Sequence, residues 1–103
     1  MNFSELRERY AAGESPCAVI AVIYQKILER NDPSLFLHLP EENELLEVAR
    51  KVESMPRDLP LWGIPFVVKD NIDVAGWPTT AACPDFSYVP EADAEVVRLL
   101  RAA

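Results

Sequence analysis

The feature that most constrains this fold is one helix with apolar residues on more than one face. Ser15-Pro16 reads as an N-cap followed by a proline at the first helical position, and Asn31 as a C-terminal stop, which predicts a helix over residues 16–30. Its main stripe has helical spacing, and further valines lie off that stripe: Ile20, Ile23, Tyr24, Ile27 and Leu28 on the stripe, Val19 and Val22 beside it. A helix this broadly apolar needs packing partners on two sides.

The flanking patterns predict two more helices before residue 55 and a change from helical to strand-like patterns after residue 60. We expect helices over residues 2–10 and Glu41–Glu53 and a last helix over Glu91–Ala103 with a Val96, Leu99, Leu100, Ala103 stripe. Ile64, Phe66, Val67 and Val68 form a continuous apolar run that favours a buried strand, and Trp77–Thr80 favours a second extended piece. The predicted organisation is a helical region (1–55), a proline-bracketed linker (56–60) and the start of an α/β core (61–103).

Size and charge exclude several classes of protein. The 103 residues are enough for one small domain. Seventeen acidic against ten basic residues give a net charge of −7, which argues against nucleic acid and anionic lipid as partners. No apolar run approaches the roughly 20 residues that a membrane span needs. Because residues 1–10 do not resemble a signal peptide and the two cysteines lie far apart, we expect a cytoplasmic protein with reduced thiols.

Few residues offer chemistry, and each has an ordinary structural interpretation. Cys17 and Cys83 are typical of small buried side chains, and a Cys83–His38 nucleophilic pair would need both in one cleft. A single histidine and two scattered cysteines predict no metal site. Asp70 and Asp73 could form an acid–base pair, but a solvated turn explains them equally.

Lys69 has two interpretations. A lysine that ends an apolar strand is commonly a surface residue whose ammonium reaches water. In a dry cleft, however, desolvation or nearby cations would lower its pKa toward neutrality. The neutral amine could then take the proton of a serine hydroxyl and activate it as a nucleophile.

The segment LWGIPFVVKDNIDVAGWPTTAACP, residues 61–84, resembles the N-terminal part of the amidase signature family. Ala81-Ala82-Cys83-Pro84, followed by Phe86 and Tyr88, resembles the allophanate hydrolases within that family. The resemblance implies a serine hydrolase of amides on a large mixed sheet covered by helices, with a Ser–cis-Ser–Lys triad and no cofactor. Lys69 occupies the position of the triad lysine, which would act as general base.

Both triad serines of the family lie in a Ser/Gly-rich segment that these residues do not contain. We therefore expect the N-terminal part of an incomplete amidase-signature fold: three helices, then short strands and a further helix. This N-terminal part would contribute Lys69 to the active site but would be inactive alone. It would bind a small amide substrate only when the missing segment is present. The reaction that the resemblance implies is the hydrolysis of allophanate to ammonia and carbon dioxide, in urea breakdown.

The alternative is a non-catalytic accessory or binding subunit that docks on a larger partner. The broad helix and a last helix with no stop signal fit both hypotheses. Either one predicts exposed apolar surface around Ile20, Ile23 and Val96, and hence a homo-oligomer or a larger protein partner.

Overall fold

A computed structural model describes all of residues 1–103, which divide into two compact units. The first, the helical unit, comprises Met1–Asp32 and Glu41–Pro65. The second, the loop unit, comprises Pro33–Pro40 and Phe66–Ala103. These units are defined by contacts within the chain, and the domain boundaries at residues 55 and 61 stay a prediction.

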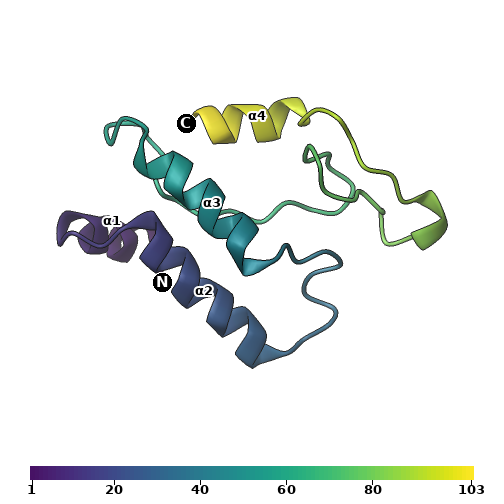
Figure 1. Ribbon diagram of the computed structural model, residues 1–103, viewed down its shortest axis with the longest axis horizontal. Helices are drawn as coiled ribbons and strands as arrows, with labels where there is room; N and C mark the ends of the chain where they lie inside the picture. The colour runs from purple at the N-terminus through teal and green to yellow at the C-terminus, as the bar shows by residue number, and fades with distance from the viewer. The chain divides into compact units, whose positions relative to one another are not determined.

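Three helices build the helical unit: α1 (Phe3–Ala11), α2 (Pro16–Arg30) and α3 (Glu42–Glu53) (Figure 1). Side-chain caps mark the N-terminal ends of α1 and α2, whereas α3 begins without one. Asn2 and Glu5 form a reciprocal capping box, with hydrogen bonds of 2.9 and 3.0 Å. The Ser15 hydroxyl accepts a bond of 3.1 Å from the Ala18 amide. Asn31 closes α2 in the left-handed conformation, at φ 48°. The predicted spans of these helices are confirmed to within one residue.

Helix α2 finds partners on two sides, as its apolar breadth requires. It packs along α3 (Figure 1). Val19, only 1% exposed, joins Leu6 and Tyr10 of α1 in a buried cluster, with Trp62 and Ile64 packed against it. Burial of these side chains is the main force that holds the unit together.

Gly63 brings the segment after α3 close to α1. The Tyr10 hydroxyl donates a hydrogen bond of 2.5 Å to the Gly63 carbonyl. A Cβ on Gly63 would lie 2.8 Å from the Tyr10 ring, and its φ of +72° is one that side chains disfavour. Only glycine fits this approach without displacing the tyrosine.

The loop unit contains little regular structure. It holds a 3-10 turn, η1 (Pro84–Phe86), one short helix, α4 (Glu95–Ala102), and one isolated antiparallel bridge between Thr79 and Tyr88. Val74, Thr79 and Val97 are among its buried residues, at 7%, 2% and 1% exposure.

The predicted strands do not form within this chain. Residues 64–68 form no regular secondary structure and pair with no other segment, and Phe66 and Val67 are 44% and 72% exposed. The Trp77–Thr80 piece contributes only Thr79 to the single bridge. A strand needs a neighbouring strand to satisfy its backbone, so the mixed sheet stays a prediction. Ser34–Leu39 forms a turn and a bend.

Helix α4 begins four residues later than expected and turns a different face inward. The Ala94 amide donates to the Asp73 carbonyl at 3.0 Å, and Asp93 accepts from the Ala75 amide at 2.8 Å. Because of these hydrogen bonds, the residues before Glu95 belong to the loop rather than to the helix. Val97 is buried, whereas Val96 and Leu99 of the predicted stripe are 51% and 53% exposed.

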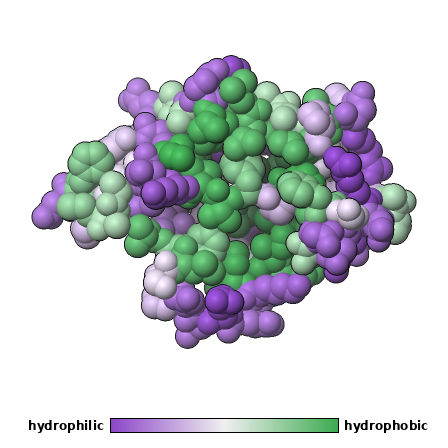
Figure 2. All heavy atoms as spheres, turned by 180° about the vertical axis from the view of Figure 1, so that it is seen from behind, coloured by the Kyte–Doolittle hydropathy of each residue, from purple (hydrophilic) through white to green (hydrophobic).

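Exposed apolar side chains are numerous, and many appear as green atoms in Figure 2. The expectation of exposed apolar surface is confirmed at Val96. It is only partly met at Ile20 and Ile23, which are half-buried. None of the helices is both long enough and apolar enough to cross a membrane.

Candidate functional site

Lys69 lies in the loop unit, where the irregular stretch after the Gly63 turn leads into a tight turn. Its carbonyl accepts a hydrogen bond of 2.9 Å from the Ile72 amide, which closes that turn. Its side chain is exposed and has no carboxylate partner within ion-pair distance. Within these residues Lys69 therefore occupies an open position, as the surface interpretation predicted. The catalytic assignment stays a prediction.

Asp70, the next residue, anchors a second loop that returns to the same place. Its carboxylate accepts hydrogen bonds from the Thr80 hydroxyl and, at 3.3 Å each, from the amides of Thr80 and Ala82. Its carbonyl accepts from the amides of Thr80 and Ala81 at 3.2 and 3.0 Å. One aspartate thus fixes the path of residues 80–82 beside Lys69.

The anchored loop adopts an unusual backbone. Ala81 and Ala82 both have positive φ, 49° and 58°, the left-handed region that costs a residue with a side chain about 1 kcal/mol or more. Consecutive residues in this region persist only where surrounding bonds hold them, and such strain concentrates at functional sites. Here the bonds that hold them come from Asp70.

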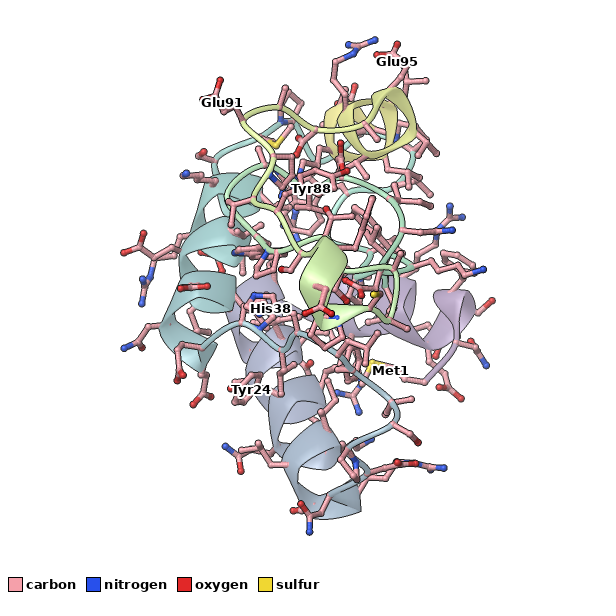
Figure 3. All side chains as sticks on the ribbon, turned by 90° about the vertical axis from the view of Figure 1, so that its right-hand side faces the viewer. Met1, Tyr24, His38, Tyr88, Glu91 and Glu95 are labelled. Carbon is pink, nitrogen blue, oxygen red and sulfur yellow. The ribbon has the colours of Figure 1, made fainter.

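Asp73 organises a separate network. Its carboxylate accepts from the Thr79 hydroxyl at 3.0 Å and from the Tyr88 hydroxyl at 2.5 Å, next to the backbone bridge that joins Thr79 to Tyr88. Tyr88 is labelled in Figure 3 on the segment that leads to α4. The bond to Asp73 raises the pKa of the Tyr88 hydroxyl, because the phenol that donates it is neutral.

These networks do not support Asp70 and Asp73 as an acid–base pair. The two carboxylates accept hydrogen bonds from different threonines and share no partner. The bond from the Thr80 hydroxyl lowers the pKa of Asp70 below its ordinary value, so this carboxylate is ionised at neutral pH and has no proton to donate. Both residues act here as loop anchors.

The cysteines and His38 are not assembled into a nucleophilic pair. Cys83 is exposed, contrary to the prediction of a buried side chain, and forms no hydrogen bond with His38. The His38 ring, labelled in Figure 3, stands 6.0 Å from the Trp77 ring, and its Nε2 is buried without a hydrogen-bond partner. Cys17 is half-buried, and desolvation raises the pKa of its thiol. No group of three or more potential ligands could hold a metal ion.

Sequence reasoning missed the anchoring role of Asp70. No periodicity links an aspartate to a threonine ten residues later, so the contact follows only from the folded loop. The available signal was the density of turn residues and threonines around it, which marks a bonded loop without naming the bonds.

Comparison with known proteins gives a consistent set of relatives. A family model described as Amidase matches residues 19–103. A urea amidolyase of Saccharomyces cerevisiae is 67% identical over 45 residues, which are 44% of this chain and 2% of that protein. A glutamyl-tRNA(Gln) amidotransferase subunit of Thermus thermophilus is 37% identical over 99 residues, 95% of this chain and 20% of that protein.

Solved structures agree with these relatives. The allophanate hydrolase of Kluyveromyces lactis superposes with a TM-score of 0.73 at 33% identity, over 90% of this chain and 16% of that one. The urea amidolyase of K. lactis gives the same score, with 6% of its length covered. The chain therefore spans at most a fifth of the length of the relatives and structures named here.

Proposed function

The chain belongs to the amidase family, and from this premise we propose that it is the N-terminal portion of an allophanate hydrolase that carries the catalytic lysine, Lys69. The complete enzyme would convert allophanate to ammonia and carbon dioxide. The 103 residues alone would be inactive, because they lack the Ser/Gly-rich segment that bears both triad serines.

The observation that carries the choice of substrate is the 67% identity to a urea amidolyase over 45 residues. That level is well above the 37% shared with the amidotransferase protein, although the latter match extends over 95% of the chain. Structural similarity to an allophanate hydrolase over 90% of the chain supports the same choice.

The proposed chemistry assigns one step to this chain. A neutral Lys69 amine accepts a proton relayed from the nucleophilic serine, whose oxygen attacks the amide carbon. The carbon–nitrogen bond then breaks, ammonia leaves with the returned proton, and water releases the acyl group. A neutral amine requires a desolvated site. Since Lys69 is exposed here, the remainder of the enzyme would supply the cover.

Within this proposal Asp70 is a positioning residue. It holds the strained loop at residues 80–82 against the backbone that carries Lys69. That arrangement fixes the direction in which the chain leaves Lys69 and so limits where its amine lies.

The test is a chimera in which these residues replace the corresponding segment of the K. lactis allophanate hydrolase, with ammonia release from allophanate as the readout. Lys69→Ala should lower turnover by about a thousandfold or more, and Lys69→Arg should fail equally because arginine stays protonated and cannot act as a base. Lys26→Ala removes an exposed lysine of α2 and is the matched control.

Three results would count against the proposal. Near-normal turnover in Lys69→Ala would exclude Lys69 as the general base. A chimera that releases ammonia from glutamine and not from allophanate would favour the amidotransferase type of substrate. An isolated 103-residue chain found bound to a larger protein in its source cells would instead favour the accessory role.

A further inference from the structure

Asp73, Thr79 and Tyr88 form a closed network of hydrogen bonds in the loop unit. The Thr79 amide donates to the Tyr88 carbonyl at 2.8 Å, and the Tyr88 amide donates to the Thr79 carbonyl at 3.1 Å. The hydroxyl groups of Thr79 and Tyr88 both donate to Oδ1 of Asp73, at 3.0 and 2.5 Å. Each of the three residues is therefore bonded to both of the others, and displacement of one disturbs all three.

This network holds one end of the turn that carries Lys69. Asp70 is the second residue of that turn, and Asp73 directly follows it. The two aspartates accept hydrogen bonds from consecutive residues of the returning loop, Asp73 from the Thr79 hydroxyl and Asp70 from the Thr80 hydroxyl. Thr79 is only 2% exposed, so its bond forms away from competing water. The turn is thus fastened at both ends to one dipeptide.

Tyr88 takes no direct part in the proposed chemistry. A phenol has one proton to donate, and the proton of Tyr88 is directed to Asp73. This bond raises the pKa of the Tyr88 hydroxyl, which is therefore neutral at neutral pH and does not act as a base. Any effect of Tyr88 on the reaction comes through the groups that it holds in place.

We propose that Tyr88 is a positioning residue for Lys69 that acts through Asp73 and Thr79, an inference that rests on the function proposed for Lys69. The Tyr88 hydroxyl restrains the Asp73 carboxylate, and Asp73 restrains the backbone where the turn ends. Displacement of a catalytic group by about 1 Å lowers turnover by on the order of a hundredfold. A hydroxyl that does not touch the substrate therefore affects the rate.

The first test is Tyr88→Phe in the allophanate hydrolase chimera, with ammonia release as the readout. Phenylalanine keeps the ring that meets Phe86 edge to face at 5.6 Å, and only the hydroxyl is lost. We expect kcat to fall by about tenfold or more because the amine is displaced. KM should change by less than about twofold, because Tyr88 does not bind the substrate.

A double-mutant cycle separates positioning from a loss of folding. When Lys69→Ala has removed the amine, Tyr88 has nothing left to position. Tyr88→Phe should then lower the residual turnover by less than about twofold. A hydroxyl that only stabilised the fold would lower turnover by the same factor with and without Lys69.

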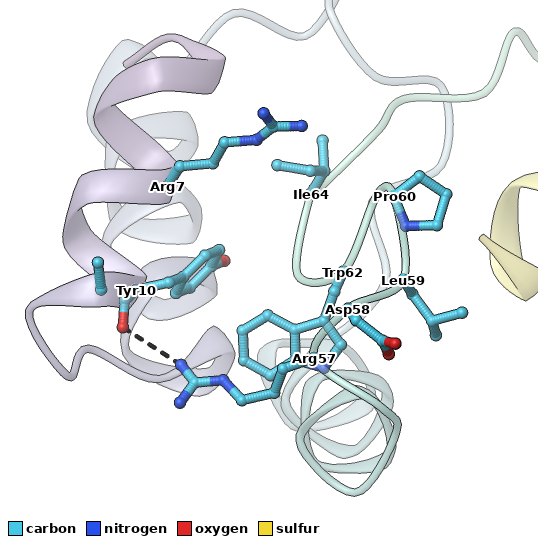
Figure 4. Close-up of a pocket in the computed structure, with 9 residues that line it drawn as sticks. Arg7, Tyr10, Arg57, Asp58, Leu59, Pro60, Trp62 and Ile64 are labelled. Carbon is cyan, nitrogen blue, oxygen red and sulfur yellow. Dashed lines mark hydrogen bonds between the residues drawn. The ribbon is translucent and has the colours of Figure 1, made fainter.

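Tyr10→Phe is the matched control for this cycle. It also removes a tyrosine hydroxyl that bonds to a residue distant in sequence, the Gly63 carbonyl. Tyr10, however, belongs to the helical unit, and Figure 4 shows it with Arg57 and Trp62 of the same unit. Its effect on turnover should be the same with and without Lys69.

Thr79 offers a pair of variants that test the same bonds. Thr79→Val keeps the shape of the buried side chain and removes its hydroxyl, so it should reproduce the fall in kcat. Thr79→Ser retains a hydroxyl for Asp73 and should keep kcat within about threefold of the unaltered chimera.

Amide hydrogen exchange of Ile72 in the 103-residue protein tests the restraint without catalysis. The Ile72 amide donates to the Lys69 carbonyl at 2.9 Å and so reports how firmly the turn is closed. Tyr88→Phe should speed this exchange by about threefold or more. Ser87→Ala, which removes an exposed hydroxyl from the neighbouring residue, should leave the exchange unchanged.

Three results overturn the positioning role: unchanged Ile72 exchange in Tyr88→Phe, an equal fall in kcat with and without Lys69, or a loss of turnover in Thr79→Ser as large as that in Thr79→Val. Failure of the proposed function looks different. If Lys69→Ala keeps its turnover while Ile72 exchange still responds to Tyr88→Phe, the restraint exists but the lysine is not the base.

Discussion

The two units of this chain are stabilised by different means. In the helical unit, side-chain caps fix the N-terminal ends of α1 and α2, and a buried cluster around Val19 and Tyr10 joins these helices to the segment after α3. In the loop unit, Asp70, Asp73 and Asp93 hold an irregular chain by accepting hydrogen bonds from backbone amides and hydroxyl groups. Apolar burial stabilises the first unit, and charge-assisted hydrogen bonds shape the second.

The difference assigns separate roles to the two units. The helical unit has a buried core, and local signals predict its helices. The loop unit carries the residue proposed for catalysis, next to two left-handed alanines that are held only by hydrogen bonds. The strained pair of alanines therefore lies in the unit for which chemistry is proposed.

The largest expected effect tests the apolar side of the comparison. Val19→Ala removes a side chain that is only 1% exposed and should lower the free energy of unfolding of the helical unit by about 2–3 kcal/mol. Val22→Ala is the control on the same helix: Val22 is 41% exposed, so its loss should cost close to nothing. Denaturant unfolding followed by helical circular dichroism measures both. Equal destabilisation by the two variants would contradict a core centred on Val19.

Replacing an alanine by glycine should stabilise the loop unit at one position and destabilise the helical unit at another. Ala82→Gly relieves a left-handed φ of 58° and should stabilise the loop unit by about 0.5–1 kcal/mol, after the greater freedom of glycine in the unfolded chain is subtracted. Ala21→Gly, inside α2, should destabilise the helical unit by about 1 kcal/mol. Amide hydrogen exchange in each unit reads out both changes. A destabilising Ala82→Gly would mean that the loop is not strained.

The smallest effect concerns pH. The hydrogen bonds to Asp70 lower its pKa in the folded protein below the ordinary 3.8, so the stability they confer is present above that value and is lost as pH falls through the folded-state pKa. The amide signals of Thr80 and Ala82 should therefore shift with a midpoint below 3.8. At neutral pH, Asp70→Asn should speed their hydrogen exchange severalfold.

Asp85→Asn is the control for this titration, since Asp85 is an exposed aspartate of the same unit. It should leave both the midpoint and the exchange rates unchanged. A midpoint at or above 3.8 in the unaltered protein would show that the carboxylate is not held as described.

Local signals were enough to predict most of the helical unit. Ser15-Pro16 and Asn31 set the limits of α2, because capping depends on hydrogen bonds between residues a few positions apart. The same short-range chemistry located α1 to within a residue, and apolar spacing located α3 equally well. A helix satisfies its own backbone, so its existence needs no distant partner.

Long-range bonds decided the rest. The apolar run at residues 64–68 does not become a strand, because a strand requires a second segment to pair with and none in these residues does so. Helix α4 starts late because Ala94 and Asp93 bond to the loop around residues 73–75. The inward face of α4 follows from where that loop directs the chain, which periodicity does not encode.

The sequence by itself determined the three N-terminal helices, the breadth of α2 and the family, the last through the segment around Lys69. Tertiary structure alone decided that Asp70 bonds to Thr80 and Ala82 and that Arg57 donates to the Tyr10 carbonyl. The reason is the separation along the chain. A cap or a motif joins neighbouring residues, whereas these groups are brought together only when segments 10 to 47 residues apart fold against each other.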